Sequence, residues 1–375
     1  MPNASSTRKR LTDRLRAAQA DGELGRFRVV ALHDFSLDRI IGIRAFPPFV
    51  QTATRILSQG GGLLPDSSQS VQPGGCAAGA ATTVARLGIE THFVCRTDEL
   101  GGYLLRYYLG RRGVNLEHVR TDGRLALAAC IEVGADRHNI MINDQASFAD
   151  FGYEDLTAAD LELMRTADVI GVFDWCLNRK GTGLAAGLCE RFGTAGRKIY
   201  FDTSDPAPRQ EEIPELMAKV FRHPGLSFLN LNENELHHFS GDLGGGSSLE
   251  RLVELTQALQ ARIHPQLTVH TIHFSLDVSR GVTVVPTLCI APRRATGSGD
   301  TWNGGNIAGH LLGLEPDERL MMANAVAGYY CAMESGDRPT LDRLIEFLED
   351  PGVRLNELEA APARCPTGGA RGPSC

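Results

Sequence analysis

Long apolar stretches are absent from the sequence, and no run approaches the ~18 residues that a membrane-spanning helix needs. The first residues are polar and contain no apolar stretch of the kind found in secretory signals. Paired cysteine motifs are also absent, because the nine cysteines are scattered, odd in number and form no Cys-x-x-Cys pair. Such a pattern favours reduced thiols over disulfides or a zinc site. We therefore expect a cytoplasmic protein that has no membrane partner.

An excess of positive charge is absent as well, because 45 acidic residues outnumber 38 lysines and arginines. The formal net charge is −7, and the only basic block is the short Arg8-Lys9-Arg10, so nucleic acid is not an expected partner. Hydrophobic residues make up 42% of the chain and charged residues 22%, which is close to the average for soluble proteins. The 375 residues therefore suffice for one large domain with appendages.

Residues 1–26 are predicted to form a charged helical extension, because Leu11 and Leu15 are spaced about one helical turn apart. From residue 27 onward, short strand-like segments alternate with helical segments. The predicted strands of this pattern are 27–32, 91–95, 169–173, 198–201, 227–231 and 267–274. The alternation predicts an α/β fold with a mostly parallel central sheet and helices on both faces.

Two further segments depart from this alternation. Residues 124–148 contain two alternating apolar stretches around a turn at 134–136, which predicts a β-hairpin. Residues 351–375 are rich in proline, glycine and alanine. We expect this tail to lack regular structure.

The segment Gly297-Ser298-Gly299-Asp300-Thr301 lies between a strand-like stretch and a helical stretch. Small residues let the backbone turn tightly and leave its N–H groups uncovered, and a helix N-terminus favours anions. The carboxylate of Asp300 is expected at the mouth of this anion site. Such an arrangement suits phosphoryl transfer, in which the carboxylate takes a hydroxyl proton. A simple linking turn is the alternative interpretation.

Three segments in this order resemble the PfkB, or ribokinase-like, carbohydrate kinase family. They are residues 74–88, the Asn-x-x-Glu motif at 232–235, and the turn at 297–301, which is similar to the family's Gly-Ala-Gly-Asp-Thr. The resemblance covers residues 27–350, which we expect to form one kinase domain. It implies a three-layer α/β/α sandwich with a small β lid built from segments near 40–55 and 124–148.

The resemblance implies that Asp300 is the catalytic base. It also implies that the amides of Gly297, Ser298 and Gly299 form the anion hole for the transferring phosphoryl group. The alternative role of Asp300 is to cap the following helix.

Substrate contacts are implied for two further groups of residues. Asp38 would hold two hydroxyls of the phosphoryl acceptor, unless it is a solvated loop acid. Gly74 and Gly75 would let the backbone approach the sugar closely. Cys76 and Gly79 stand where the family usually has asparagines that touch the sugar, so the sequence departs from the family here.

A second substrate segment runs from Asp202 through Asp205 to Arg209, and it resembles an Asp-x-Asn-x-Arg segment of many sugar kinases. Arg209 is therefore a candidate substrate-binding residue, and a structural ion pair is the alternative interpretation.

Five residues are expected to bind the nucleotide and its Mg²⁺. Asn232 and Glu235 would organise Mg²⁺, with Glu235 acting through water, although a first-turn carboxylate also complements a helix dipole. Arg294, Thr296 and Asn324 are the remaining candidates. Arg294-Ala295 replaces the family's Asp-Thr, and Arg294 can reach phosphate itself. ATP is the expected donor, with ADP as the alternative, and the family also allows activation by K⁺.

The expected function is transfer of the ATP γ-phosphate to a hydroxyl of a sugar or sugar-like small molecule. The alternatives are a nucleoside or sugar-acid kinase, an ADP-dependent sugar kinase, and a non-catalytic ligand-binding relative. A dinucleotide-dependent oxidoreductase is disfavoured, because the strand-Gly-x-Gly-x-x-Gly-helix fingerprint is absent near the first strand. The resemblance also allows a homodimer formed through the lid.

Overall fold

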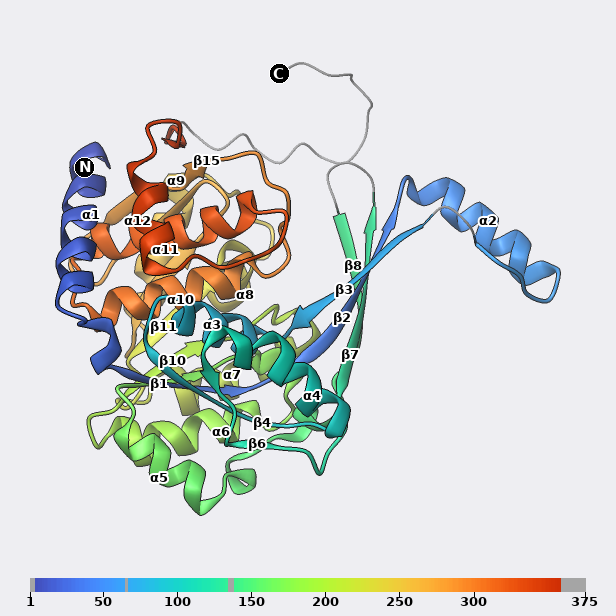
Figure 1. Ribbon diagram of the computed structural model, residues 1–375, viewed down its shortest axis with the longest axis horizontal. Coiled ribbons are helices and arrows are strands. Elements are labelled where there is room, and N and C mark those ends of the chain that lie inside the picture. The colour runs from blue at the N-terminus through green and yellow to red at the C-terminus, as the bar shows by residue number, and fades with distance from the viewer. Residues whose placement is uncertain (1–3, 65–66, 134–137, 359–375) are drawn as a thin grey trace.

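A twisted central sheet runs through the body of the protein (Figure 1). The computed structural model describes residues 4–64, 67–133 and 138–358. The order of strands in this sheet is β14-β13-β12-β11-β10-β9-β1-β4-β5, with β6 also paired to β4. Their bounds are β1 Arg28–His33, β4 Glu90–Arg96, β5 Val114–Asn115, β6 Val119–Arg120, β9 Val169–Val172, β10 Lys198–Asp202, β11 Phe228–Asn232, β12 Gln266–His270, β13 Phe274–Asp277 and β14 Thr283–Pro286.

All pairs from β12 to β5 are parallel, and only β12-β13-β14 form an antiparallel edge. The single strand predicted over 267–274 is therefore two strands joined by a turn. Alternate residues of β1 enter separate cores, with Val29 and Ala31 on one face and Val30 and Leu32 on the other. This alternation follows from the two-residue period of a strand that is covered on both faces.

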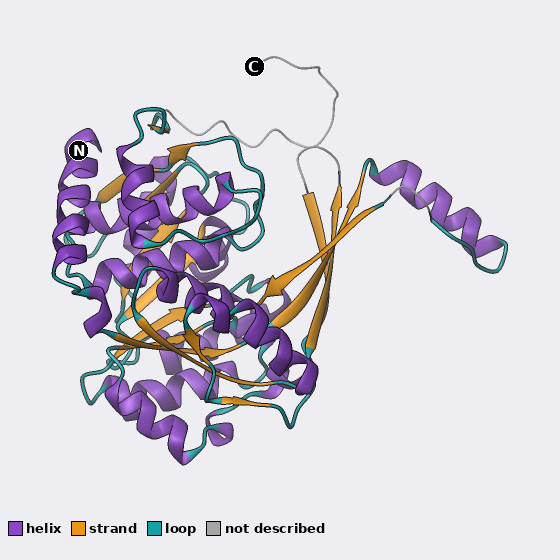
Figure 2. Cartoon of the chain, viewed as in Figure 1, coloured by secondary structure: helices purple, strands orange, loops and turns teal. Residues whose placement is uncertain are grey.

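Helices cover both faces of the sheet and complete three layers (Figure 2). The first core includes residues from α1 Ala4–Ala20, α3 Cys76–Arg86, α4 Glu99–Tyr108, α10 Ser298–Leu311, α11 Pro316–Ala332 and α12 Leu341–Glu349. The second core includes residues from α5 Ala158–Thr166, α6 Gly181–Leu188, α7 Ile213–Leu216, α8 Glu233–Ser240 and α9 Leu249–Gln260. The predicted α/β/α sandwich is therefore confirmed. None of the described helices is both long and apolar enough to cross a membrane.

The N-terminal extension forms α1, as the spacing of its leucines predicts. Leu11 and Leu15 are fully buried in the first core, where α1 packs against α11 and α12. Arg14 holds Glu23 at 2.7 Å, and Arg16 holds Glu349 at the same distance. The helix is thus an integral part of the domain rather than an appendage to it.

A second, four-stranded sheet leaves the body, and we call it the lid after its predicted role (Figure 1). Its order is β3-β2-β7-β8, with bounds β3 Ser68–Gly74, β2 Ser36–Ile43, β7 Ala126–Val133 and β8 His138–Asp144. The antiparallel pairing of β7 with β8 confirms the two strands of the predicted hairpin. The predicted turn at 134–136 lies outside the described residues.

The expected extended lid segment near 40–55 is only partly correct. Strand β2 ends at Ile43, and residues Phe46–Ser58 form helix α2, which projects away from the body (Figure 1). Two prolines in its first turn start this helix, which is a position that proline favours. The lid strand that sequence reasoning missed is β3. Its polar residues lie close to glycines and carry no apolar alternation.

The expectation of an unstructured tail after residue 350 is wrong for its first part. Strand β16, Arg354–Leu355, pairs with β15, Leu288–Cys289. The next residue, Asn356, donates its backbone N–H to the carbonyl of Thr287 at 2.8 Å. Residues 359–375 lie outside the described residues.

Candidate active site

The candidate site lies at the C-terminal ends of the central strands, beneath the lid. Asp34 follows β1, Asp174 follows β9, Asp202 ends β10 and Asn232 ends β11. Ligands of open α/β sheets bind at this edge, because strand-to-helix loops converge there. Asp38 enters from β2 of the lid and Asp300 from the first turn of α10.

The glycine turn before α10 has the geometry of an anion site. Gly297 is left-handed, with φ 86° and ψ 4°, a conformation that glycine adopts without steric cost. The amide of Ser298 donates to the carbonyl of Ala295 at 3.1 Å, so the turn itself uses this N–H. The first-turn amides of Gly299 and Asp300 have no acceptor among the described residues. Gly299 and Asp300, rather than Ser298, therefore present open amides at the positive end of the helix.

Two cavities meet at this turn. We call the first the lid cavity; it has a volume of about 430 Å³ and lies between the lid and the strand ends. Its lining residues are Ser36, Asp38, Gly75, Cys76, Leu127, Ala128, Met141, Asn143, Asp144, Phe148, Asp174, Cys176, Leu177, Ser204, Asp205, Pro208, Thr296 and Asp300.

The second, which we call the apolar cavity, has a volume of about 620 Å³. Its walls include Ile272, Leu288, Ile290, Pro292, Trp302 and Ala327, together with the predicted residues Asn232, Arg294, Ser298, Gly299 and Asn324. The imidazole of His270 stacks on Trp302 with ring centroids 4.9 Å apart. An apolar, aromatic wall beside open amides is suited to a ligand with a planar ring and an anionic end.

The predicted substrate residues Asp38, Gly75 and Cys76 come together in the lid cavity, along with Asp300. Ser36 donates its hydroxyl to Asp38 at 2.6 Å, and Asp38 is only 5% exposed. Gly74 packs so closely on the Asp38 carboxylate that a Cβ there would overlap its oxygens. This close approach explains why glycine is needed at that position.

Gly79 lies beside Asp300, and its missing side chain makes room for an arginine. A Cβ at Gly79 would be 2.6 Å from the Asp300 Cβ, 3.1 Å from its Oδ2 and 3.2 Å from Nη2 of Arg338. Arg338 is 9% exposed, its Nε has no partner among the described residues, and its guanidinium lies 5.0 Å from the Tyr330 ring. Sequence reasoning missed Arg338. The only signal for it was the unexplained glycine at 79.

The electrostatics of the site are dominated by buried carboxylates. Burial and the nearby Asp202 raise the pKa of Asp300 to about 6, while Cys76 and Arg338 act in the opposite direction. Burial also raises the pKa of Asp174, to about 7, with Asp202 and Asp300 adding to the effect and hydrogen bonds from Ser204 and Leu177 acting against it. The pKa of Asp34 is raised well above its usual value by burial and by Asp174. Each charge is therefore costly, because the carboxylates face one another out of water.

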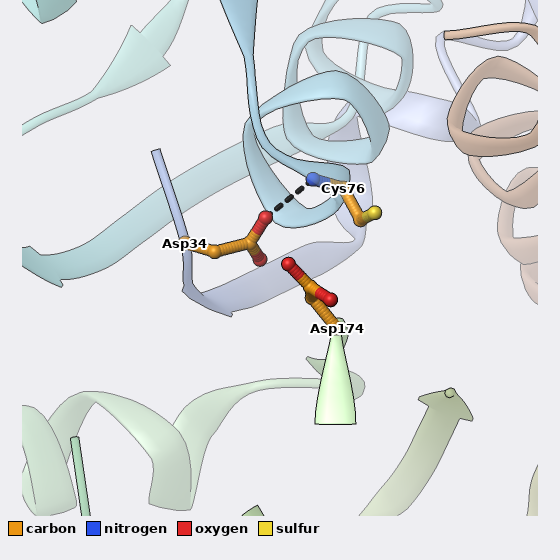
Figure 3. A group of neighbouring side chains, drawn as sticks. All are labelled: Asp34, Cys76 and Asp174. Carbon is orange, nitrogen blue, oxygen red and sulfur yellow. Dashed lines mark hydrogen bonds between the residues drawn. The ribbon is translucent and has the colours of Figure 1, made fainter. Parts of the chain in front are cut away.

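Asp34 and Asp174 are two acids that sequence reasoning did not single out, and they form a cluster with Cys76 (Figure 3). Asp34 accepts hydrogen bonds from the backbone amides of Cys76 and Ala77, the latter at 3.0 Å. It therefore satisfies the N-terminus of α3 from outside the helix. The Cys76 thiol lies 3.3 Å from the Ser204 hydroxyl. The signal for the two acids in the sequence was their position, with Asp34 directly after β1 and Asp174 two residues after β9.

Asn232 and Glu235 form a capping box at the start of α8. Glu235 accepts from the backbone N–H of Asn232 at 2.8 Å and from its Nδ2 at 2.6 Å, and Asn232 Oδ1 accepts from the Glu235 amide. Glu235 is 3% exposed. Burial, Asp202 and Asp205 raise its pKa well above the usual value. The contacts of Asn232 and Glu235 in this structure are thus those of a helix N-terminus, which is the alternative role given in the sequence analysis.

Two other candidate residues, Arg209 and Asn324, form contacts with other residues of the protein itself. Arg209 binds Glu212 and the carbonyls of Trp175 and Asn178, and its guanidinium lies 4.3 Å from the Trp175 ring. It is not among the residues that line either cavity. Asn324 accepts from Trp302 Nε1 at 2.8 Å while it borders the apolar cavity.

The fold and the site together define a lidded α/β/α protein in which one glycine turn joins two cavities. A family model described as pfkB family carbohydrate kinase matches residues 49–341. The chain therefore belongs to the pfkB family of carbohydrate kinases, and the resemblance drawn from its motifs is confirmed.

Similar proteins agree with this assignment. Ribokinase from Haemophilus influenzae is 21% identical over 301 residues, which cover 77% of this chain and 91% of that protein. The structure of Arabidopsis thaliana ribokinase complexed with ribose and ATP matches with a TM-score of 0.67 and 20% identity, over 86% of this chain and 98% of that one. Adenosine kinase from Sinorhizobium meliloti matches with a TM-score of 0.64 and 16% identity, over 82% and 94% of the two chains. These structures share the fold of this chain.

Proposed function

We propose that this protein transfers the γ-phosphate of ATP to a hydroxyl group of a sugar or sugar-like small molecule. One observation carries the proposal: Asp300 lines the lid cavity, while Gly299 of the same turn, whose amide is open, lines the apolar cavity. A base for the phosphoryl acceptor and amides for the transferring group thus meet within one helical turn.

Asp300 is proposed as the base. A pKa of about 6 leaves its carboxylate mostly ionised at neutral pH, and hence able to take a hydroxyl proton. Asp38 is proposed to hold hydroxyls of the acceptor, with one of its oxygens already oriented by Ser36. The amides of Gly299 and Asp300 would stabilise the charge on the transferring phosphoryl group.

The apolar cavity is proposed to take the nucleotide, with ATP bound in the related Arabidopsis ribokinase structure as support. Arg294, Thr296 and Asn324 border the path from this cavity to Asp300. The mutually repelling carboxylates of Asp202, Asp205 and Glu235 fit a divalent cation. Asn232 and Glu235 would hold Mg²⁺ through its waters, and Mg²⁺ would neutralise phosphate charge during transfer. K⁺ remains an additional proposed activator.

The test is a coupled assay of ADP release with ATP and Mg²⁺ across pentoses, hexoses, amino sugars, sugar acids, polyols and nucleosides. Asp300→Asn should lower kcat about 10³-fold with the acceptor that works. Asp13→Asn, an exposed change on α1, is the matched control and should keep full activity. Ligand-induced stabilisation without turnover, with either ATP or ADP as donor, would instead indicate a binding protein.

A further inference from the structure

The lid cavity is strongly acidic. Five aspartates line it, namely Asp38, Asp144, Asp174, Asp205 and Asp300. Within the described part of the chain, its lining includes no lysine, arginine or histidine. A phosphoryl acceptor that carries a phosphate or carboxylate would meet repulsion from every ionised wall residue. The charge of the cavity therefore favours a neutral or cationic molecule.

The surroundings of Asp174 indicate whether the cavity favours a neutral or a cationic molecule. It is only 4% exposed, and its Oδ1 is buried without a hydrogen-bond partner among the described residues. Figure 3 shows its side chain pointing toward Asp34 and Cys76, whose ligand atoms lie within 4.8 Å of its own carboxylate oxygen. A buried oxygen without a donor is costly. A donor supplied by the ligand would remove that cost.

Three other aspartates of this wall already have hydrogen-bond or ion-pair partners. Asp38 accepts from Ser36, and Asp144 is paired with Arg124 at 2.9 Å. Asp205 accepts from the amide of Ala207 at 3.0 Å and from Asn234 Nδ2 at 3.1 Å. Both oxygens of Asp34, behind Asp174, bind the amides at the start of α3. Among the aspartates of this wall, Asp174 is the one with a buried oxygen that has no hydrogen-bond partner among the described residues.

An ammonium group suits this position better than a hydroxyl. A hydroxyl donates one hydrogen bond and carries no charge, whereas an ammonium has three donors and a positive charge that favours the ionised form of Asp174. The raised pKa of Asp174 reflects the cost of placing negative charge there, which a bound cation offsets. We propose that the acceptor is an amino sugar or a related amino polyol, and that Asp174 binds its ammonium group. This inference rests on the proposed function and adds the class of substrate.

A metal ion is the competing cation at the Asp34, Asp174 and Cys76 cluster. Its ligands are poorly prepared, because both oxygens of Asp34 are used by backbone amides. Burial and the surrounding aspartates raise the pKa of the Cys76 thiol well above its usual value, so the thiol stays protonated. A metal needs the thiolate. The observations therefore favour the organic cation.

The first test compares matched acceptors in the ADP-release assay at neutral pH. The sets are D-glucosamine, D-glucose and N-acetyl-D-glucosamine, the same three forms of galactose and mannose, and 1-amino-1-deoxy-D-fructose against D-fructose. In at least one set, the amine should exceed its neutral counterparts in kcat/KM by about tenfold or more. Asp174→Asn should bring that ratio close to one, whereas Asp13→Asn, a change at an exposed aspartate outside the cavity, should preserve it.

The second test needs no turnover and so separates the two proposals. Melting temperatures are measured for wild type and Asp174→Asn with each compound at fixed ionic strength, and also with MnCl₂ or ZnCl₂ alone. Stabilisation by an amine over its N-acetyl form, lost in Asp174→Asn, supports the inference even if no acceptor is phosphorylated. Equal or better performance of the neutral sugars in both tests would overturn it. A preference for amines that persists in Asp174→Asn, or stabilisation by the metals that depends on Asp174, would overturn it as well.

Discussion

Asp300 and Arg338 approach the same point in space, directly above Gly79. A Cβ placed on Gly79 would be 3.1 Å from Oδ2 of Asp300 and 3.2 Å from Nη2 of Arg338. The family resemblance leads one to expect an asparagine at this position. In this chain the guanidinium of a residue far away in the sequence fills that volume and brings a positive charge beside the proposed base.

Removing the charge of Arg338 should shift the pH dependence of catalysis. Arg338 lowers the pKa of Asp300, and the proposed base acts only when ionised. In Arg338→Met that pKa should rise, so activity should disappear at a higher pH as the solution is acidified. The acid limb of kcat/KM against pH should move upward by roughly one pH unit or more. Arg338→Lys should largely restore it, and an unmoved limb in Arg338→Met would contradict this role.

A side chain at Gly79 should disturb the base directly. The Cβ of Gly79→Ala would come 2.6 Å from the Asp300 Cβ, a distance that requires one of the two backbones to move. We expect kcat to fall by about 10²-fold. Gly183→Ala on α6 is the control, because its Cβ would meet nothing within 4 Å, and there we expect full activity with unchanged or slightly higher stability.

We expect Gly297 to be required for two reasons: its backbone is left-handed, and there is no room for a side chain at this position. In Gly297→Ala, a residue held at φ 86° would also bring its Cβ 2.7 Å from the Tyr330 hydroxyl. The left-handed conformation alone should cost roughly 1–2 kcal/mol, measured by urea unfolding, and displacement of the turn should lower kcat further. Gly313→Ala has φ 62° but no neighbour within 4 Å. It should show the loss of stability without the loss of turnover. Similar kcat in the two variants would argue against the turn as the phosphate site.

The buried ion pair between Arg319 and Asp277 should matter for folding. Their side chains are 2% and 1% exposed, and Arg319 also donates to Asn306 at 2.5 Å. Arg319→Met leaves a buried carboxylate without its cation and should lower the free energy of unfolding by roughly 3–5 kcal/mol. Arg280→Met removes an exposed pair with Glu315 and should change it by less than about 1 kcal/mol. Equal effects of the two changes in chemical denaturation would be inconsistent with this difference.

The sequence predicts the central sheet well because its strands are buried on both faces and appear as short apolar runs. It predicts the glycine turn for a similar reason, since the required small residues and Asp300 are adjacent in the chain. Strand β3 is harder to predict, because a lid strand is half exposed and needs no apolar alternation. Helix α2 begins with prolines, which can be taken equally well for an extended segment.

Residues that act through tertiary contacts were not accessible to motif reasoning. Arg338 lies in the loop between α11 and α12, and only the fold brings it beside Gly79 of α3 and Asp300 of α10. Arg209 was expected at the substrate because it follows two aspartates, whereas the fold directs it to Glu212 and backbone carbonyls. Only the fold shows that Asp174 belongs to the wall of a cavity and that one of its oxygens is buried without a partner among the described residues.

The pairing of β16 with β15 has a consequence for where the functional unit ends. Asn356, just after β16, borders the apolar cavity together with Leu288 of β15. Expression boundaries drawn at residue 350, where the composition turns rich in proline and glycine, would remove part of the wall of the proposed nucleotide pocket. A shortened recombinant protein of this kind would be expected to fold around its sheet and yet bind its phosphate donor weakly. Its inactivity would then be a property of the cloning design rather than of the natural protein.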